Sequence, residues 1–263
     1  MRKRKEKMFP VERQEKILAY INEHKTVTTT ELAAVFGMTS VTIRSDINAL
    51  AELGLVLKTH GGAVTTEQRL NLEVPIRQKM QLQVREKQRI GAAAAAMIAP
   101  GDMVILDSGS TTLAIAKRIT AREVTVITND VFIAKTLIDN GIVRVHVTGG
   151  RASENVYSLS GRITEDYLSG IQVNKLFLGC DAIDFDWGIS NRTEEEVATK
   201  QAMIAASKTV IAVADSSKFG KRVFERVCKM DALDILITDK LTESEAETLN
   251  AIGIETIICK QTD

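Results

Sequence analysis

Cysteine and histidine are both scarce in this chain, with three of each among 263 residues. The cysteines lie far apart and form no C-x-x-C pair: Cys180, Cys228 and Cys259. The histidines are equally scattered: His24, His60 and His146. A metal site needs several such ligands close together, and disulfide frameworks are built from paired cysteines. We therefore expect three reduced thiols, no metal site and no cofactor.

Long apolar runs are also absent. No uninterrupted apolar stretch approaches the ~18 residues that indicate a membrane span. The longest run of small residues, 91–98, is mostly alanine and predicts a buried helix. The first ten residues, MRKRKEKMFP, are basic, but no apolar segment follows them as it would in a secretory signal. We expect a cytoplasmic protein without membrane contact.

The chain has no net charge, because 34 Lys and Arg balance 34 Asp and Glu. The charges are nevertheless unevenly distributed: residues 1–62 carry ten basic and seven acidic side chains, which gives +3 and leaves −3 for the remainder. A basic first segment and an acidic body are compatible with a nucleic-acid-binding end, although a difference of this size is weak evidence alone.

Helical spacing of apolar residues recurs three times before residue 55. The first helix is predicted at residues 11–23, the second begins at Thr28 or Thr29 and ends at Gly37, and the third ends at Gly54. Two short helices joined by a tight turn are typical of a helix-turn-helix. Residues 55–64 then predict a strand, a Gly-Gly turn and a second strand, which would form a small wing.

The exposed face of the predicted third helix has the composition of a DNA-reading surface. Its short polar side chains permit deep entry into the major groove, and its arginine can pair with guanine. A merely solvated helix face is an equal alternative on this segment alone. The DNA-contacting candidates on the helix and wing are Thr39, Ser40, Val41, Thr42, Arg44, Ser45, Lys58 and His60.

Residues 64–85 are polar, contain Pro75 and lack a sustained apolar stripe, which indicates an exposed connection that is partly helical after Pro75. From residue 86 onward, helical and strand patterns alternate. Strands are predicted at residues 103–106, 124–127, 143–147, 175–178, 210–213, 235–237 and 255–258. Helices are predicted at residues 87–98, 112–119, 131–139, 163–168, 194–207 and 243–251. The apolar strands favour a doubly wound, Rossmann-like α/β body with a parallel sheet covered on both faces.

Polar residues follow five of these strands, at positions 107–112, 128–130, 148–151, 179–181 and 214–218. The carboxyl ends of parallel strands meet at one sheet edge, so these segments predict a polar ligand site. The first segment, DSGSTT, precedes a helix whose N-terminal amides attract phosphate. It matches neither a Walker A loop nor G-x-G-x-x-G, so a sugar or polyol phosphate is favoured over a nucleotide.

Both halves of the chain resemble the DeoR family of bacterial transcription regulators. In the head, the resemblance rests on Arg13, Ile17 and Ile21, on the run from Thr39 to Ile47, and on the Gly61-Gly62-Ala63 triplet. Ser45 departs from the pattern, because the family usually has a second basic residue there. In the body it rests on DSGSTT, TND, GG, LGCDAID, EEVATKQAM and ADSSKFG. Cys180 and Ala182 stand where alanine and a second glycine are usual.

The resemblance implies a winged helix-turn-helix at residues 1–63, a linker at 64–85 and a sensor domain at 86–263. The sensor resembles ribose-phosphate isomerase and CoA transferase folds. The implied partners are double-stranded operator DNA, a phosphorylated sugar effector and further copies of the chain, as a dimer or tetramer. The effector-binding candidates are Asp107, Ser108, Gly109, Ser110, Thr111, Thr112, Asn129, Gly149, Gly150, Asp181, Lys200, Asp215 and Lys218.

A regulator that senses its ligand is favoured over an enzyme, and no catalytic residue is assigned. The alternative is a sugar-phosphate isomerase fused to a DNA-binding head, and Glu194, Glu195 and Glu196 are its candidate bases. Glu196 and Lys200 could also form an ordinary surface pair one helical turn apart. A CoA-ester ligand is a further alternative. The resemblance implies a repressor of a sugar or polyol catabolic operon, whose affinity for its operator is controlled by the phosphorylated sugar. The sequence names neither the sugar nor the operator, nor whether the effector induces or co-represses.

Overall fold

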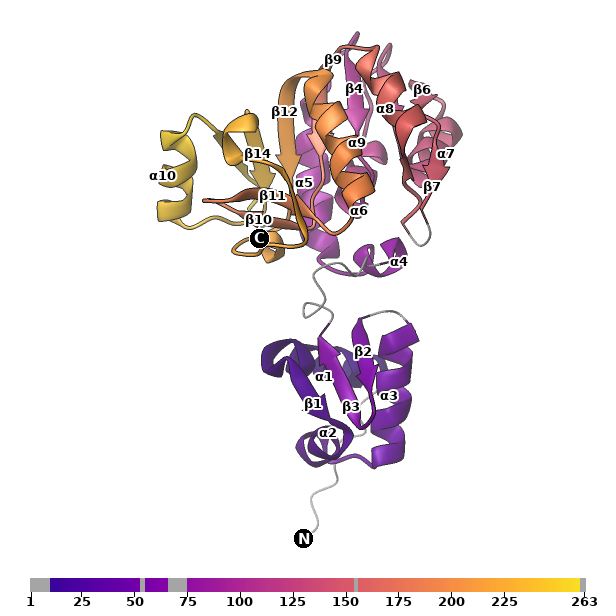
Figure 1. Ribbon diagram of the computed structural model, residues 1–263, viewed down its shortest axis with the longest axis vertical. Helices are drawn as coiled ribbons and strands as arrows, with labels where there is room; N and C mark the ends of the chain where they lie inside the picture. The colour runs from indigo at the N-terminus through magenta and orange to yellow at the C-terminus, as the bar shows by residue number, and fades with distance from the viewer. Residues whose placement is uncertain (1–9, 53–54, 66–74, 154–155, 261–263) are drawn as a thin grey trace. The chain divides into compact units, whose positions relative to one another are not determined.

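The computed structural model describes residues 10–52, 55–65, 75–153 and 156–260. The basic residues 1–9 and the predicted helix end at Gly54 lie outside these ranges. The chain divides into two compact units, residues 1–78 and 79–263, here called the head and the body (Figure 1). Residues 79–85, predicted as part of the connection, therefore pack with the body. Among the described residues, no helix is both long and apolar enough to cross a bilayer.

The head is a winged helix-turn-helix, as predicted. Its helices are α1 (Pro10–His24), α2 (Thr29–Phe36) and α3 (Ser40–Glu52). Its antiparallel sheet has the order β1-β3-β2, with β1 at Thr26–Thr28, β2 at Val56–Thr59 and β3 at Gly62–Thr65. The strand β1 was not predicted, because its three residues are too short to show a pattern.

Local capping determines where the head helices begin and end. Thr28 and Glu31 form a reciprocal capping box at the start of α2, and Gly37 ends that helix in the left-handed conformation with φ 61°. The Thr39 hydroxyl accepts a hydrogen bond of 3.2 Å from the Thr42 amide at the start of α3. These caps leave the turn between α2 and α3 only three residues long.

A buried ion pair connects α1 to α3. The Arg13 guanidinium donates to both carboxylate oxygens of Asp46, at 2.6 and 3.0 Å. The Asp46 side chain is 3% exposed. Ile17 of α1 and Ile43 and Ile47 of α3 belong to the same buried apolar cluster of the head. Two motif residues thus set the orientation of α3 and leave its outer face open.

The body is built on a seven-stranded, entirely parallel sheet with the order β15-β14-β12-β9-β4-β5-β6, which confirms the predicted α/β class. Its strands are β4 (Met103–Leu106), β5 (Thr125–Thr128), β6 (Arg144–Val147), β9 (Val173–Leu178), β12 (Ser207–Val213), β14 (Ile235–Thr238) and β15 (Glu255–Ile258). Its longer helices are α5 (Val84–Ala96), α6 (Ser110–Ala116), α7 (Val131–Asn140), α8 (Arg162–Ser169), α9 (Glu194–Ala205) and α10 (Glu243–Ala251).

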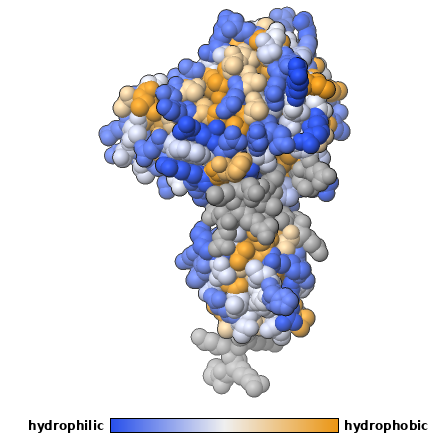
Figure 2. All heavy atoms as spheres, in the orientation of Figure 1, coloured by the Kyte–Doolittle hydropathy of each residue, from blue (hydrophilic) through white to orange (hydrophobic). Residues whose placement is uncertain are grey.

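Two apolar clusters sandwich this sheet. One face packs against residues of α8 and α9, including Leu168, Val197 and Met203. The other packs against α5, α6 and α7, including Ile90 and Ile133. Hydrophilic side chains cover much of the face shown in Figure 2, with smaller apolar areas between them. The sheet is therefore buried on both sides, as its apolar strands predicted.

Several short elements were not predicted. A small antiparallel sheet has the order β10-β11-β13, with β10 at Ala182–Asp184, β11 at Gly188–Asn191 and β13 at Glu225–Cys228. A hairpin joins β7 (Arg151–Ala152) to β8 (Leu159–Ser160). The 3₁₀ segments are η2 (Ser216–Lys218) and η3 (Met230–Ala232). The short helix α4 (Ile76–Lys79), where helical structure after Pro75 was predicted, spans the division between the two units. These elements have two to four residues, too few for hydrophobic periodicity to emerge.

Helix boundaries around the candidate loop differ from the prediction. The helix α6 begins at Ser110 rather than residue 112, so Ser110 and Thr111 belong to its first turn. The helix α5 begins at Val84 rather than residue 87. Gly91 allows α5 to approach α6 closely, since a Cβ atom there would lie 2.7 Å from the Ala114 carbonyl carbon. This close approach brings Lys87, one turn before Gly91, toward the loop that precedes α6.

Replacing Gly91 by valine is expected to destabilise the body by about 1–3 kcal/mol, because the added side chain overpacks the contact between α5 and α6. Ala92→Val is the matched control, because Ala92 is exposed on the same helix and should lose only about 0.5 kcal/mol of helix propensity. Urea unfolding of both variants, followed by circular dichroism, measures the difference. Equal stabilities would contradict the packing described here.

Candidate functional sites

An open cavity lies at the carboxyl ends of β4 and β9 in the body, and its empty space of about 410 Å³ includes the solvent at its mouth. After β4 the chain adds β5 and β6 on one side of the sheet, and after β9 it adds β12, β14 and β15 on the other side. Such a switch point is where open α/β sheets bind ligands. The lining residues are Lys79, Lys87, Ser108, Gly109, Ser110, Thr111, Thr112, Gly179, Cys180, Asp181, Asn191, Glu196, Lys200 and Lys218.

Eight of the thirteen sequence-predicted effector residues line this cavity: Ser108, Gly109, Ser110, Thr111, Thr112, Asp181, Lys200 and Lys218. The other five do not. Asp107 lies beneath the cavity, and Asp215 caps η2 by accepting hydrogen bonds from Ser217. The Asn129 amide donates to the Leu159 carbonyl of β8 at 3.1 Å.

Gly149 and Gly150 support the corner between β6 and α8. The Gly149 carbonyl accepts a hydrogen bond of 2.6 Å from the Thr164 hydroxyl. A Cβ atom on Gly150 would lie 2.3 Å from that same hydroxyl oxygen and 2.7 Å from the Ser160 carbonyl oxygen. The structure thus gives these glycines a packing role on the far side of β5 from the cavity.

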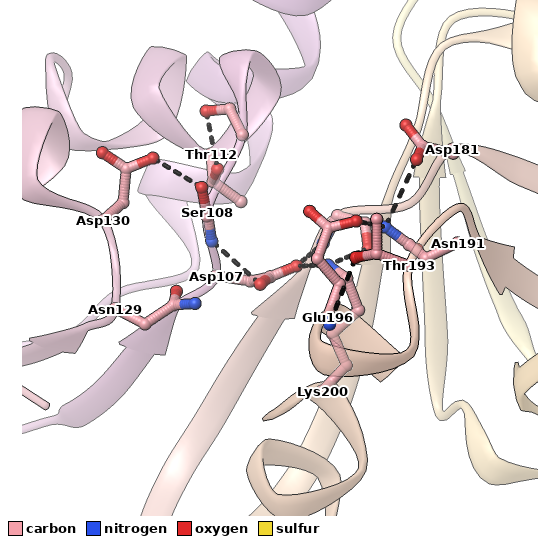
Figure 3. A network of polar contacts seen from close by, with 12 residues as sticks. Asp107, Ser108, Thr112, Asn129, Asp130, Asp181, Asn191, Thr193, Glu196 and Lys200 are labelled. Atoms are coloured by element: carbon pink, nitrogen blue, oxygen red, sulfur yellow. Dashed lines mark hydrogen bonds and ion pairs between the residues drawn. The ribbon is translucent and has the colours of Figure 1, made fainter. Parts of the chain in front are cut away.

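A buried ion pair between Asp107 and Lys200 forms the floor of the cavity (Figure 3). The Asp107 carboxylate also accepts hydrogen bonds from the amides of Ser108 and Gly179, at 2.8 and 2.9 Å. The Lys200 ammonium donates to the Gly179 carbonyl at 3.0 Å. Burial lowers the pKa of Lys200, but Asp107 and Glu196 outweigh this effect and hold the pKa above its ordinary value. Lys200 is therefore cationic, and the alternative of a surface Glu196–Lys200 pair is wrong.

The hydroxyls of the DSGSTT loop divide into two groups. The Ser108 hydroxyl donates to Asp130 at 2.7 Å, and the Thr112 hydroxyl donates to the Gly109 carbonyl at 2.9 Å (Figure 3). These two bonds hold the shape of the loop. The hydroxyls of Ser110 and Thr111 line the cavity and make no hydrogen bond to another described residue. They are the loop side chains that remain available to a ligand.

Asp130 was missed by sequence reasoning, although it lies in the quoted TND motif. Its carboxylate accepts hydrogen bonds from the amides of Phe132 and Ile133 at the start of α7, as well as from Ser108. Burial raises the pKa of Asp130, and the three hydrogen bonds oppose that rise. Asp130 therefore connects the loop after β4 to the helix after β5.

The cavity carries an excess of positive charge. Its lining contains four lysines, at positions 79, 87, 200 and 218, and two carboxylates, Asp181 and Glu196. Burial raises the pKa of Asp181, but Lys79, Lys218 and Arg192 outweigh it and hold the pKa well below its usual range. Asp181 pairs with Lys79 at 2.9 Å, and Glu196 accepts a hydrogen bond of 3.2 Å from the Asn191 amide. The arrangement favours an anion that also carries hydroxyl groups.

Lys79, Lys87 and Asn191 line the cavity but were not named by sequence reasoning, and the two lysines are the charged residues among them. They precede the first strand of the sheet, and reach its carboxyl edge only because α5 packs closely on α6. Burial, together with the charges of Lys218 and Lys79, lowers the pKa of Lys87 to about 8. No residue pattern signals this placement, because it depends on a contact between helices.

The other lining residues are less suited to chemistry. Removal from solvent raises the pKa of the Cys180 thiol to about 12, so this thiol is unreactive at neutral pH. Of the three candidate bases, Glu196 alone lines the cavity. Glu195 instead forms an exposed ion pair with Arg151 at 3.0 Å.

In the head, the outer face of α3 is open. Val41 is 74% exposed, and Arg44 and Ser45 are exposed beside it, whereas Thr42 is half-buried and hydrogen-bonded to Thr39. On the wing, Lys58 and His60 are both exposed at the end of β2. An exposed valine beside an arginine suits contact with a thymine methyl and a guanine edge.

Known protein families match both the head and the body. A family model described as the DeoR-like helix-turn-helix domain matches residues 13–69, and one described as the DeoR C terminal sensor domain matches residues 82–240. The chain is 32% identical over 257 residues to the HTH-type transcriptional repressor GlcR of Bacillus subtilis, covering 97% of this chain and 98% of the relative. It is 32% identical over 240 residues to the transcriptional repressor AccR of Agrobacterium fabrum, covering 90% and 93%.

Among solved structures, a ribose 5-phosphate isomerase from Plasmodium falciparum is similar over 51% of this chain and 52% of its own, with a TM-score of 0.37 and 16% identity. The two family models together span both units, and a relative more than 30% identical matches nearly the whole length. This chain therefore belongs to the DeoR family of helix-turn-helix transcriptional regulators.

Proposed function

We propose that this protein represses a carbohydrate operon in the cytoplasm and that a phosphorylated sugar or polyol, bound in the body cavity, controls its affinity for operator DNA. The observation that carries the proposal is the cavity at the switch point, which is lined by four lysines together with Ser110 and Thr111. For such a ligand to induce expression, it must bind the DNA-free arrangement more tightly, and the coupling is reciprocal.

The lining supports a sugar phosphate over other anions. The ammonium groups suit a phosphate, while Asp181, Glu196 and Asn191 offer the acceptors and donors that sugar hydroxyls require. None of the lining residues is aromatic, so the cavity offers no stacking surface for a nucleotide base.

Sensing is supported over catalysis. An isomerase needs a base that is free to take a proton from carbon, whereas Glu196 is engaged by Asn191. Lys200 is neutralised by Asp107 and cannot act as a base while its pKa lies above the ordinary value. The groups around the cavity therefore serve to hold an anion in place.

On DNA, α3 would lie in the major groove, with Arg44 on a guanine and Val41 on a thymine methyl. Lys58 and His60 of the wing would contact the phosphate backbone. A single winged head buries little DNA surface, so the protein would act as a dimer or tetramer on repeated or palindromic half-sites.

A thermal-shift screen tests the ligand class. Ribose 5-phosphate, glucose 6-phosphate, fructose 6-phosphate and glycerol 3-phosphate are compared with their unphosphorylated parents, since a ligand at a hundred times its Kd stabilises by about 2.7 kcal/mol. At least one ester should raise the melting temperature while its parent does not.

The loop supplies the control for this screen. The Ser110→Ala/Thr111→Ala variant should lose about 3–6 kcal/mol of binding free energy, because two hydrogen bonds to a charged group disappear. Ser169→Ala/Thr248→Ala removes two hydroxyls away from the cavity and should leave binding unchanged. A phosphate ester that binds the loop variant as tightly as it binds the parent would contradict the proposed site.

Arg44→Ala is expected to weaken operator binding by about 1–3 kcal/mol, because a fork-like contact with guanine is lost. An operator selected from random duplexes and measured by fluorescence anisotropy provides the readout. Arg162→Ala, whose side chain is 89% exposed in the body, is the matched control and should bind DNA like the parent. Undiminished binding by Arg44→Ala would show that another surface reads the DNA.

Whether or not ribose 5-phosphate binds, the protein should not convert it to the ketose, because Glu196 and Lys200 are both engaged and cannot act as the base. A coupled assay for the ketose product, run with excess protein, measures any turnover. Steady ketose formation that disappears in Glu196→Gln and persists in Glu195→Gln would establish the isomerase alternative instead.

A further inference from the structure

The segment that joins the body to the head forms part of the cavity wall. Lys79, the first residue of the body, and Lys87, on the first turn of α5, both line the cavity. Between them, residues 80–83 form a turn whose Gln83 has φ 50°, a conformation that costs roughly 1–2 kcal/mol in a residue other than glycine. Residues 81–85 are exposed to solvent. The turn therefore depends on a few specific contacts for its shape.

Lysine ammonium groups supply those contacts. The Lys87 ammonium donates to the carbonyls of Lys79 and Leu82, at 2.5 and 2.7 Å, and so bridges the two ends of the turn. The Lys79 ammonium is held by Asp181 at 2.9 Å. Met80 adds an apolar contact with the core of the body. The groups that hold the turn in place are thus the same groups that face the ligand cavity.

We propose that Lys79 and Lys87 bind the phosphate of the effector directly. In doing so, Lys79 breaks its ion pair with Asp181, and Lys87 breaks the hydrogen bonds that hold the turn at residues 80–83, through which the head is attached. This inference rests on the proposed function, because it assigns the regulatory step to the same cavity. The two lysines would contact the ligand and would also be the first residues to move when the effector binds.

The exchange of partners is favourable at Lys87 and leaves no unpaired buried charge at Lys79. Lys87 gives up two neutral carbonyls for a phosphate, and hydrogen bonds to an ionised acceptor are roughly twice as strong. The released carbonyls belong to an exposed or half-buried segment, so water can replace the ammonium. When Lys79 leaves, Asp181 keeps the charges of Lys218 and of Arg192, whose Nε lies 3.9 Å away, and is not left as an unpaired buried charge.

Lys218 provides a comparison within the same cavity. It lines the cavity as Lys79 does, but it lies on η2, which follows the turn by more than a hundred residues in the sequence. Removing either ammonium should weaken anion binding, whereas only Lys79 should transmit binding to residues 80–83. The two roles of a cavity lysine can therefore be measured separately.

The experiment is hydrogen–deuterium exchange of the full chain with and without inorganic phosphate, which carries the chemistry shared by all candidate esters. In the parent, phosphate should protect the amides of residues 108–112. It should also speed exchange of the Lys87 amide, which donates to the Gln83 carbonyl at 3.0 Å, by about tenfold. In Lys79→Met, protection at 108–112 should persist at higher phosphate, while the response of the Lys87 amide should be smaller than in the parent, because only Lys87 still changes partners. Lys218→Met should keep the response, and Lys79→Arg should restore it.

The possible results separate the two proposals. Protection at residues 108–112 without any change at 80–87 in the parent overturns this inference and leaves the proposed site intact. Equal responses of the Lys87 amide in Lys79→Met and Lys218→Met overturn it as well. An absence of protection at residues 108–112 in the parent overturns the proposed phosphate site, and the inference falls with it.

Discussion

The body depends on the buried carboxylate of Asp107. It joins the end of β4 to the end of β9 through the Gly179 amide, and it holds Lys200 of α9 beneath the cavity. Removing one member of such a pair leaves an uncompensated buried charge, which typically costs 3–5 kcal/mol. The two halves of the sheet diverge at this point, so the same interaction that closes the core also defines where a ligand can lie.

Most of the polar groups around the cavity are engaged by the protein itself. Ser108, Thr112 and Asp130 hold the loop, and Asn191 holds Glu196. The groups that a ligand can reach without displacing one of these contacts include the Ser110 and Thr111 hydroxyls and the first-turn amides of α6. A preorganised frame with few available groups suits recognition, because the ordering of the site takes place during folding and not during binding.

The sequence predicted the elements that repeat a pattern. The seven parallel strands, the helix-turn-helix and the loop after β4 all carry local signals such as apolar runs, caps and clustered hydroxyls. The small sheet formed by β10, β11 and β13 was missed because its strands are short and partly polar. Lys79 and Lys87 were missed because their position depends on the approach of two helices at Gly91. Asn129, Gly149 and Gly150 resemble the other strand-end residues in sequence, yet they pack against β8 and α8.

The position of Lys79 has a practical consequence for isolating the sensor. The family model of the sensor begins at residue 82, and a truncated body cut there would lack Lys79 while retaining Asp181. Such a fragment would keep the whole sheet, yet its cavity would have one cation fewer and a buried carboxylate without its nearest partner. Ligand affinities measured on it would describe a different site. The start of the family model and the start of the binding site are thus separated by three residues of chain.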